Sequence, residues 1–366
     1  MRLSSWRHFD YWLLGAVCLL LIFGIVMIDS AIAGNIELVE ENVVQKQMIF
    51  AGIGLVVVFI FTFLDYHVWV ALGRILYVFV VGFLLWTMVA GETAFGSERW
   101  INLGFVQIQP SELAKIAVIM IAADFFARNK HKMNQLQWII RSGIFPFGMF
   151  ALIFLQPDLS TAIVILMIWA AMVFAIGIKL NHLLLLGLIA VTLVAASIPF
   201  LQDYQKQRIV NLILPDPEER YGENYNVDQA LITIGSGGWS GQGYKQGSQV
   251  QLRYLKVRDT DFIFAVISHE FGFFGAVGIM LIFVFIIYRI LRAAYLANDS
   301  FGAMICYGVA TLITFQLLVN IGMNLQLLPV TGLPLPFISR GGSSIITIMM
   351  AIGLVESVIA RHKLIE

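Results

Sequence analysis

The residue whose surroundings most clearly predict chemistry is Asp261. It lies between a polar segment, 202–260, and an apolar run that begins at Phe262. A carboxylate at the edge of an apolar segment is costly, because desolvation disfavours its charged form and a membrane edge offers little water. Ionisable groups in such a position usually mark catalysis or transport. The alternatives are a helix N-cap at the membrane edge, and a role that belongs to Asp259 two residues earlier.

A second group of polar residues precedes another apolar segment. Glu112 and Lys115 are three residues apart, so on a helix they share one face, and the segment 109–111 before them suits a helix start. The pair indicates either a structural ion pair or a polar cavity open to the outside. Asp158 follows a Gln-Pro pair at a short turn. It is predicted either to cap the next helix or to point into the same cavity.

Several cations lie in connections that are predicted to face outward. Arg99 stands beside Trp100, and Arg208 and Arg340 lie in later connections. Arginine binds phosphate groups through paired hydrogen bonds, although each arginine alone could contact lipid headgroups, and Trp100 could be an interfacial anchor. Together with Lys115, these cations would suit an anionic substrate carried on a lipid.

Two outer segments have backbone features that could approach a ligand. The loop 332–344 contains two prolines and a double glycine, and Ser343 or Ser344 is predicted to begin the last span. Non-helical backbone at membrane depth is tolerated only against protein or a wet cavity. Residues 227–234 are predicted to form an amphipathic helix on the membrane. The glycines at 235, 237, 238, 241 and 243 permit either close approach to a ligand or tight turns.

The composition predicts that these residues are positioned by membrane-spanning helices. Hydrophobic residues are 59% of the chain and charged residues 13%, whereas a soluble domain is nearer half and a quarter. The predicted fold is an all-α integral membrane protein forming a single polytopic domain over 1–366. About ten spans are expected, near 10–31, 46–64, 68–90, 111–128, 138–155, 158–178, 182–201, 270–291, 302–324 and 342–361.

The distribution of lysine and arginine predicts the orientation. These residues gather on one set of short connections and near both ends, which places both termini in the cytoplasm. The large loop 202–260, between spans seven and eight, then faces outward with Asp261. Residues 31–33 resemble a signal-peptidase site, but the preceding apolar run is long for a signal peptide and is interpreted as an uncleaved first span.

Several functional classes are disfavoured by the sequence. The net charge is zero, which argues against a nucleic-acid partner. Cys18 and Cys306 both fall in apolar runs, so a disulfide framework is not expected. The six histidines show no metal-ligand spacing, and the chain has no phosphate loop, dinucleotide fingerprint or nucleophile elbow. No organic cofactor is therefore predicted.

A series of motifs along nearly the whole chain resembles the SEDS family of shape, elongation, division and sporulation proteins, which includes RodA and FtsW. The short tails and total length resemble the RodA branch more than the FtsW branch. Arg340 departs from the pattern, because many members have tyrosine there. The motifs are Arg99-Trp100 and the segments 109–115, 156–158, 203–205, 235–238, 261–265, 320–322 and 334–339.

This resemblance implies a ten-span peptidoglycan glycosyltransferase that polymerises lipid II on the outer face of the bacterial cytoplasmic membrane. It implies a class B penicillin-binding protein as partner, membrane lipids as surroundings, and a role in cell-wall elongation and cell shape. The essential aspartate of the family maps onto Asp261. The cavity residues of the family map onto Glu112, Lys115 and Asp158.

The chemistry of that reaction suits these residues. Asp261 is predicted to act as the general base that takes a proton from the attacking sugar hydroxyl. Arg208, Arg340 or a divalent cation, Mg or Mn, would stabilise the departing diphosphate, and Asp261 could instead ligate that metal. The alternatives are a flippase or ion-coupled carrier for a lipid-linked precursor, a scaffold without activity, and a polymerase of the division or sporulation type.

Overall fold

The structure is a computed structural model of the 366-residue chain. It describes residues 9–33, 41–90, 107–179, 223–252 and 254–361. Shorter described pieces are residues 38, 40, 92–94, 97–102, 181–182, 184–185, 187–188, 206 and 210. Arg208 and most of the predicted span 182–201 lie outside the described residues.

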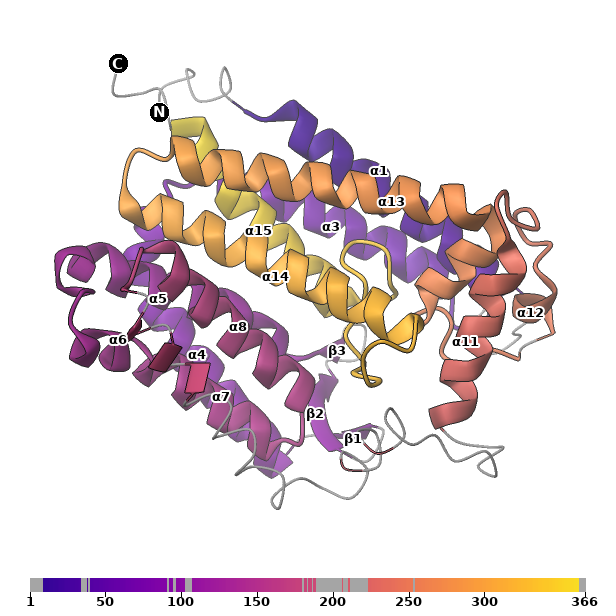
Figure 1. Ribbon diagram of the computed structural model, residues 1–366, viewed down its shortest axis with the longest axis horizontal. Coiled ribbons are helices and arrows are strands. Elements are labelled where there is room, and N and C mark those ends of the chain that lie inside the picture. Colours follow the sequence, from indigo (N-terminus) through magenta and orange to yellow (C-terminus); the bar gives the residue numbers. More distant parts are fainter. Residues whose placement is uncertain are drawn as a thin grey trace.

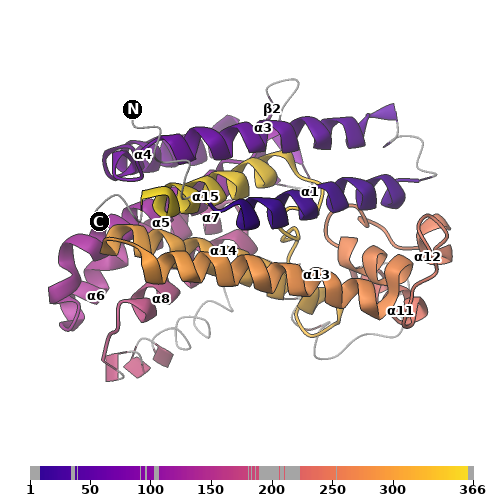
Figure 2. The same ribbon diagram turned by 90° about the horizontal axis from the view of Figure 1, so that it is seen from above.

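Long helices dominate the molecule and run alongside one another (Figure 1). Figure 2 shows α3 and α4 on one side of the bundle and α13 and α14 on the opposite side, with α1 and α15 between them. The N-terminal helices are α1 (Tyr11–Ala31), α3 (Val43–Phe63), α4 (Val68–Ala90) and α5 (Pro110–Asn129). They are followed by η2 (Lys130–Lys132), α6 (Leu136–Ser142), α7 (Ile144–Leu155) and α8 (Leu159–Ala175). The C-terminal part contains α11 (Glu223–Gly237), α12 (Ser248–Gln251), α13 (Ile263–Leu296), α14 (Ser300–Asn324) and α15 (Gly342–Arg361).

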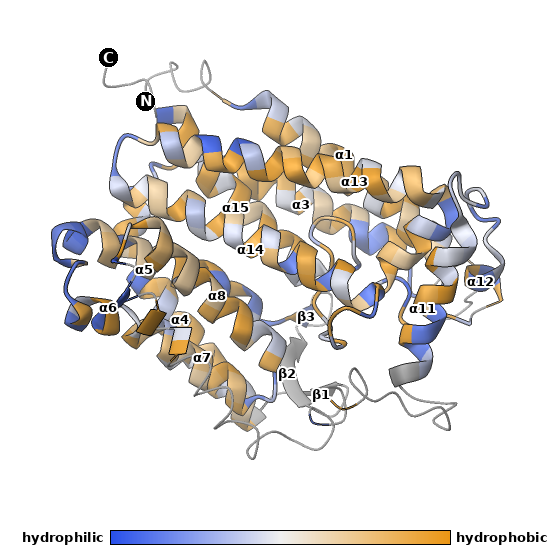
Figure 3. Ribbon diagram, in the orientation of Figure 1, coloured by the Kyte–Doolittle hydropathy of each residue, from blue (hydrophilic) through white to orange (hydrophobic). Residues whose placement is uncertain are grey.

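Among the described residues, seven helical segments are long and apolar enough to cross a membrane, and apolar residues run along most of their length (Figure 3). Helix α5 is not among them, because Glu112, Lys115, Asp124 and Arg128 interrupt its apolar sequence. Helix α8 is apolar but has only 17 residues. The seven segments are Tyr11–Ala31, Val43–Phe63, Val68–Val89, Leu136–Leu155, Ile263–Leu296, Ser300–Asn324 and Gly342–Arg361. The prediction of a mainly helical membrane protein is therefore confirmed.

Two details differ from the sequence-based expectation. A small antiparallel sheet, in the order β1-β2-β3, follows α4 and was not predicted: β1 is Glu92–Ala94, β2 is Ser97–Asn102 and β3 is Gln107–Ile108. The predicted span 270–291 also differs from α13, which runs from Ile263 to Leu296 with a break at Gly272, so the part before the break was not predicted as helix. The first eight residues of α13, 263–270, are all buried in protein. Hydropathy alone did not identify them as part of the helix.

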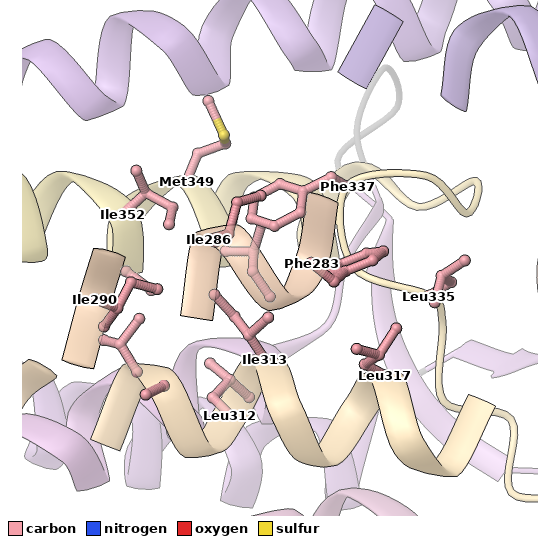
Figure 4. Packing of buried hydrophobic residues seen from close by; sticks show 14 of the residues in the cluster. Phe283, Ile286, Ile290, Leu312, Ile313, Leu317, Leu335, Phe337, Met349 and Ile352 are labelled. Carbon is pink, nitrogen blue, oxygen red and sulfur yellow. The ribbon is translucent and has the colours of Figure 1, made fainter. Parts of the chain in front are cut away.

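Side chains from α13, α14 and α15 meet in one apolar core that also includes the loop before α15 (Figure 4). Phe283 of α13 packs near Phe337 of that loop, with ring centroids 6.3 Å apart. Leu335 and Ile338 are almost fully buried as well. The apolar side chains of this irregular loop therefore anchor it to the helices, which fixes the path of its backbone.

Helix α13 is broken at Gly272, and the glycine-rich segment after α11 fills the break. Gly272 has φ 64° and ψ −162°. Phe273 N donates to Gly238 O at 2.8 Å, and Gly243 N donates to Glu270 O at 3.0 Å. The loop thus satisfies backbone groups that the interrupted helix leaves open. Gly237 and Gly241, two of the glycines predicted to permit either ligand approach or turns, allow this close approach of backbone to backbone, and Gly238 takes a positive φ of 57°.

Replacing Gly272 by alanine is expected to destabilise the protein by about 2–3 kcal/mol, because its backbone conformation is nearly restricted to glycine. An added Cβ would also overlap Gly241 N. Gly278→Ala is the matched control, since that position on the same helix has nothing within 4 Å. Thermal unfolding in detergent should show a lower midpoint for Gly272→Ala and an unchanged or higher one for Gly278→Ala. Equal midpoints would contradict this account of the break.

A cluster of polar residues joins the connection between α3 and α4 to the start of α14. The His67 ring contacts Asp65 at 2.8 Å through Nδ1 and Asp299 at 2.7 Å through Nε2. Tyr66 donates to Asp299 at 2.7 Å. Partial burial lowers the pKa of His67, but the hydrogen bonds that it donates to the Asp65 and Asp299 carboxylates outweigh this effect. The pKa of His67 therefore lies above its ordinary value of 6.5.

This cluster predicts a pH-dependent stability. A histidine whose pKa is raised on folding contributes stability that is fully present below pH 6.5 and is lost as the pH rises through the folded value. The thermal midpoint of the wild type should therefore fall relative to that of His67→Gln as the pH is raised above 6.5. A constant difference between the two midpoints over this range would contradict the prediction.

Candidate active site

The first turn of α5 carries a buried ion pair. Lys115 Nζ lies 2.6 Å from Glu112 Oε1, and the two side chains are only 1% and 6% exposed. Pro110 occupies the start of the helix, where its missing N–H costs nothing, and Glu112 follows in the first turn. The two charges predicted to share a helix face are thus in contact and shielded from solvent.

Asp158 both caps a helix and contacts the start of α5. One carboxylate oxygen accepts a hydrogen bond from Thr161 N at 3.2 Å, which caps α8. The other accepts from Gln109 Nε2 at 3.3 Å and from Ser111 Oγ at 3.5 Å. The capping role predicted for Asp158 is therefore seen, and the residue also ties the beginning of α8 to the beginning of α5. Its place in a substrate cavity stays a prediction.

Ser343 brings a third helix start to the same place. Its hydroxyl accepts from Gln109 N at 3.2 Å and donates to Gln107 O at 2.8 Å. The beginnings of α5, α8 and α15 consequently meet around Gln109. Helix N-termini carry partial positive charge and unpaired N–H groups, so their convergence favours an anion nearby.

Asp261 lies directly before α13, beside the loop that leads to α15. Its Oδ2 atom lies 3.9 Å from where a Cβ on Gly332 would stand, which places the carboxylate against the loop backbone. The neighbouring Thr331 O accepts a hydrogen bond of 2.5 Å from Ser160 Oγ, in the first turn of α8. The loop thus connects Asp261 to the helix that Asp158 caps. The Asp261 side chain is partly exposed.

Asp259, the competing carboxylate, has a different environment. It is 6% exposed, and its Oδ2 atom lies 2.8 Å from Arg340 Nη1. This ion pair holds the Asp259 carboxylate against the loop before α15. The Arg340 side chain keeps 36% of its surface exposed. Its predicted contact with a diphosphate remains a prediction.

The other predicted residues are described less fully. Arg99 and Trp100 lie on β2, where Trp100 is paired with Glu92 of β1. The next pairing, of Ile101 with Ile108, joins β2 to β3, which leads into α5. Within the described part of the chain, no group of three or more His, Cys, Asp or Glu residues could hold a metal ion. The divalent cation therefore also remains a prediction.

Sequence reasoning did not single out Ser160 or the individual role of Gln109. Ser160 lies in the first turn of α8, two residues after Asp158. Gln109 lies just before α5, two residues before Ser111. That local pattern could have indicated them, because side chains at helix starts often bind neighbouring backbone groups. The partners that they bind in this fold, Thr331 and Ser343, are distant in the sequence.

Comparisons with known proteins decide the family. Residues 11–364 match the profile of the FtsW/RodA/SpoVE family, described as "Cell cycle protein". The chain belongs to this family. It is 34% identical over 367 residues to a relative named peptidoglycan glycosyltransferase MrdB from Escherichia coli (strain K12). The match covers 98% of this chain and 95% of that relative.

Two solved structures are also similar to this chain. A chain of a structure on polymerization and crosslinking by a peptidoglycan synthase complex superposes with a TM-score of 0.80 at 28% identity. That match covers 97% of this chain and 99% of the other. The crystal structure of the Thermus thermophilus rod shape determining protein RodA has a TM-score of 0.72, also at 28% identity. It covers 98% of this chain and 99% of the other.

Proposed function

We propose that this protein is a peptidoglycan glycosyltransferase that polymerises lipid II during cell-wall elongation and maintenance of cell shape. Its family membership and the name of its Escherichia coli relative support the enzyme class. The similarity to a rod shape determining protein supports the elongation role. The observation that carries the proposal for the site is the partly exposed Asp261 carboxylate, which lies beside the loop that contacts α8.

In the proposed reaction, Asp261 acts as the general base. The 4-hydroxyl of an acceptor sugar attacks the anomeric carbon of a lipid-linked donor. The carbon–oxygen bond between the sugars forms as the bond to the lipid diphosphate breaks, and the hydroxyl proton moves to the Asp261 carboxylate. Direct displacement would convert an α-linked donor into a β-linked product. The departing lipid diphosphate takes the bonding electrons and needs positive charge nearby.

The positive charge is proposed to come from several sources. The beginnings of α5, α8 and α15 meet at Gln109 and present helix N-termini. Arg340, Arg208 and Arg99 would add guanidinium groups, and Mg or Mn would supply further charge when bound. Glu112 and Lys115 neutralise each other at 2.6 Å, so their proposed role is to shape the polar site.

The proposed topology has ten spans in one domain, with both termini in the cytoplasm and the site on the outer face. The seven apolar helices, α5, α8 and the segment 182–201 would make up the ten. Cations on either side of Trp138 in α6 support this orientation: Lys132 Nζ and Arg141 Cζ lie 4.5 and 5.0 Å from the centre of the Trp138 ring. Basic residues beside an interfacial tryptophan are typical of the cytoplasmic membrane surface.

The proposed partners are lipid II, the surrounding membrane lipids and a class B penicillin-binding protein. The related chain from a peptidoglycan synthase complex supports such an assembly. A carrier role has less support. Asp124, an acidic residue near the inner side, forms ion pairs with Arg74 at 2.8 Å and with Arg128, which indicates a structural role.

The decisive experiment is polymerisation of lipid II by the purified chain in vesicles, with and without its partner and a divalent metal. Glycan polymer is expected, and its amount is measured by gel separation of labelled strands. Movement of lipid II across the membrane without polymer would favour the carrier, and neither product under any condition would favour the scaffold. Rescue of a strain depleted of its division enzyme, but not of one depleted of its elongation enzyme, would assign the division role.

A further inference from the structure

The segment that leads into Asp261 is held through three consecutive backbone carbonyls. Asp259 O accepts a hydrogen bond from Arg340 N at 2.9 Å. Thr260 O accepts from Ser339 Oγ at 2.6 Å. Asp261 O accepts two hydrogen bonds, from Asn320 Nδ2 at 3.1 Å and from Asn324 Nδ2 at 3.0 Å. All these donors come from α14 or from the loop before α15.

The helix that follows does not use the Asp261 carbonyl. The N–H groups of Ala265 and Val266 both donate to Phe262 O, at 3.1 and 3.3 Å. In a continuous helix, the Asp261 carbonyl would receive the hydrogen bond from Ala265 N. Because a carbonyl oxygen can accept two hydrogen bonds, the two asparagine amides fill its capacity.

The two asparagines are placed to act as donors. They are four residues apart on one face of α14, and both are fully buried. Asn320 Nδ2 also donates to Leu333 O at 2.9 Å, so one amide joins the Asp261 carbonyl to the loop. Asn324 Nδ2 also donates to Asn320 O at 2.8 Å.

The side-chain oxygen of each asparagine is energetically unfavourable in this position. Asn320 Oδ1 and Asn324 Oδ1 have no hydrogen-bond partner among the described residues. A buried acceptor without a partner is unfavourable, and leucine would fill a similar volume without that penalty. The donated hydrogen bonds are therefore the physical reason for asparagine at these two positions.

We propose that Asn320, Asn324 and Ser339 are positioning residues that fix the main chain at Asp261 and so aim its carboxylate at the sugar hydroxyl. This inference rests on the proposed function of Asp261. The three side chains reach the backbone on either side of the Asp261 Cα atom, so they set the direction of its Cα–Cβ bond. A catalytic group must be held within about 0.5 Å of its productive position.

The same contacts also connect Asp261 to the rest of the site. Ser339 Oγ, which donates to Thr260 O, also accepts from Leu335 N at 2.8 Å. The Ser339 hydroxyl therefore stabilises both the turn of the loop and the segment that leads into Asp261. Since Thr331 of this loop binds Ser160 of α8, the contacts connect Asp261 to the helix that carries Asp158 at its start.

The test is the double variant Asn320→Leu/Asn324→Leu, assayed for lipid II polymerisation in vesicles. Displacement of a reacting group by about 1 Å costs roughly 100-fold in rate, so kcat is expected to fall by about 100-fold with KM for lipid II unchanged. The single variant Asn324→Leu keeps one donor to Asp261 O and should lose less. Gln316→Leu is the matched control: Gln316 lies one turn earlier on α14, is fully buried, and has no hydrogen-bond partner among the described residues. Its kcat should equal that of the wild type.

Substitutions of Ser339 test the second contact, the hydrogen bond to Thr260 O, with a smaller change in side-chain volume. Ser339→Ala removes the donor to Thr260 O and should lower kcat, while Ser339→Thr keeps a hydroxyl and should restore most of it. Hydrogen exchange by mass spectrometry should show faster exchange in residues 259–262 in the double variant and unchanged exchange in Gln316→Leu.

Three outcomes would overturn the positioning role. One is wild-type kcat in the double variant, and another is unchanged exchange in residues 259–262. An equal loss in Gln316→Leu would also overturn it, because the loss would then reflect packing of α14. If the wild type itself makes no polymer, the proposed function fails, and the exchange measurement still shows whether these donors hold the Asp261 segment.

Discussion

Replacing Asp261 by asparagine is expected to reduce the rate of lipid II polymerisation by about 10²- to 10⁴-fold, the range of a lost general base. Asparagine has nearly the same shape but cannot take up the hydroxyl proton. The fold should be retained, because α14 holds Asp261 through its backbone carbonyl. Thermal unfolding and membrane insertion should therefore match those of the wild type, while the rate of polymer formation falls.

The control for this variant is Asp259→Asn. It weakens the ion pair with Arg340, 2.8 Å away, and leaves that guanidinium without its counter-charge. A lower thermal midpoint is expected, with polymer formation retained. Polymer of normal length and rate from Asp261→Asn would refute the proposed base, and loss of polymer only in Asp259→Asn would transfer the role to that residue.

Breaking the buried pair of Glu112 and Lys115 is expected to have the largest effect on stability. Removing one partner leaves an uncompensated charge in a site that is 1% to 6% exposed, which costs about 3–5 kcal/mol. Lys115→Met should therefore lower the thermal midpoint strongly and reduce the yield of folded protein. Polymer formation should fall with it.

The double variant Glu112→Gln/Lys115→Met separates structure from function. Replacing both charges by neutral groups of similar volume is often neutral for stability. The thermal midpoint should therefore recover. If the pair only joins parts of the protein, polymer formation recovers with the midpoint; if it shapes the substrate site, polymer formation stays low. A double variant as unstable as Lys115→Met would contradict the electrostatic explanation.

The polar residues of the candidate site lie at helix starts, which explains why the site is polar. Asp158 caps α8, Glu112 lies in the first turn of α5, Ser343 lies in the first turn of α15, and Asp261 precedes α13. A helix start exposes unpaired N–H groups and partial positive charge. Four such starts linked by hydrogen bonds and the loop before α15 form a polar region inside an otherwise apolar protein.

Much of this could be predicted from the sequence, because its causes are local or depend only on the solvent. Apolar runs must be covered by lipid or protein wherever they lie, so hydropathy located α1, α3, α4, α14 and α15 within a few residues. Pro110 and Asp158 are typical helix-start residues, and they marked the beginnings of α5 and α8.

Other features depend on partners that local sequence cannot identify. Asn324 is one of several polar residues in the otherwise apolar helix α14. Its neighbours in the chain do not indicate that its amide binds the carbonyl of Asp261, 63 residues earlier. The glycines after α11 fit either a ligand or a turn until Gly272 is seen to break α13 beside them. The sheet before α5 consists of strands too short to give a clear alternation.

From the amino-acid sequence it follows that this chain is a helical membrane protein, which residues begin its helices, and which carboxylate stands at the edge of an apolar segment. The pairing of Asp259 with Arg340, the contact of Ser343 with Gln109 across 234 residues, and the hydrogen bonds from α14 to the Asp261 backbone are visible only in the folded chain. The difference lies in the distance along the chain over which each interaction acts. Burial and helix capping act on a residue and its neighbours, whereas hydrogen bonds between distant segments form only where the packing of helices brings them together.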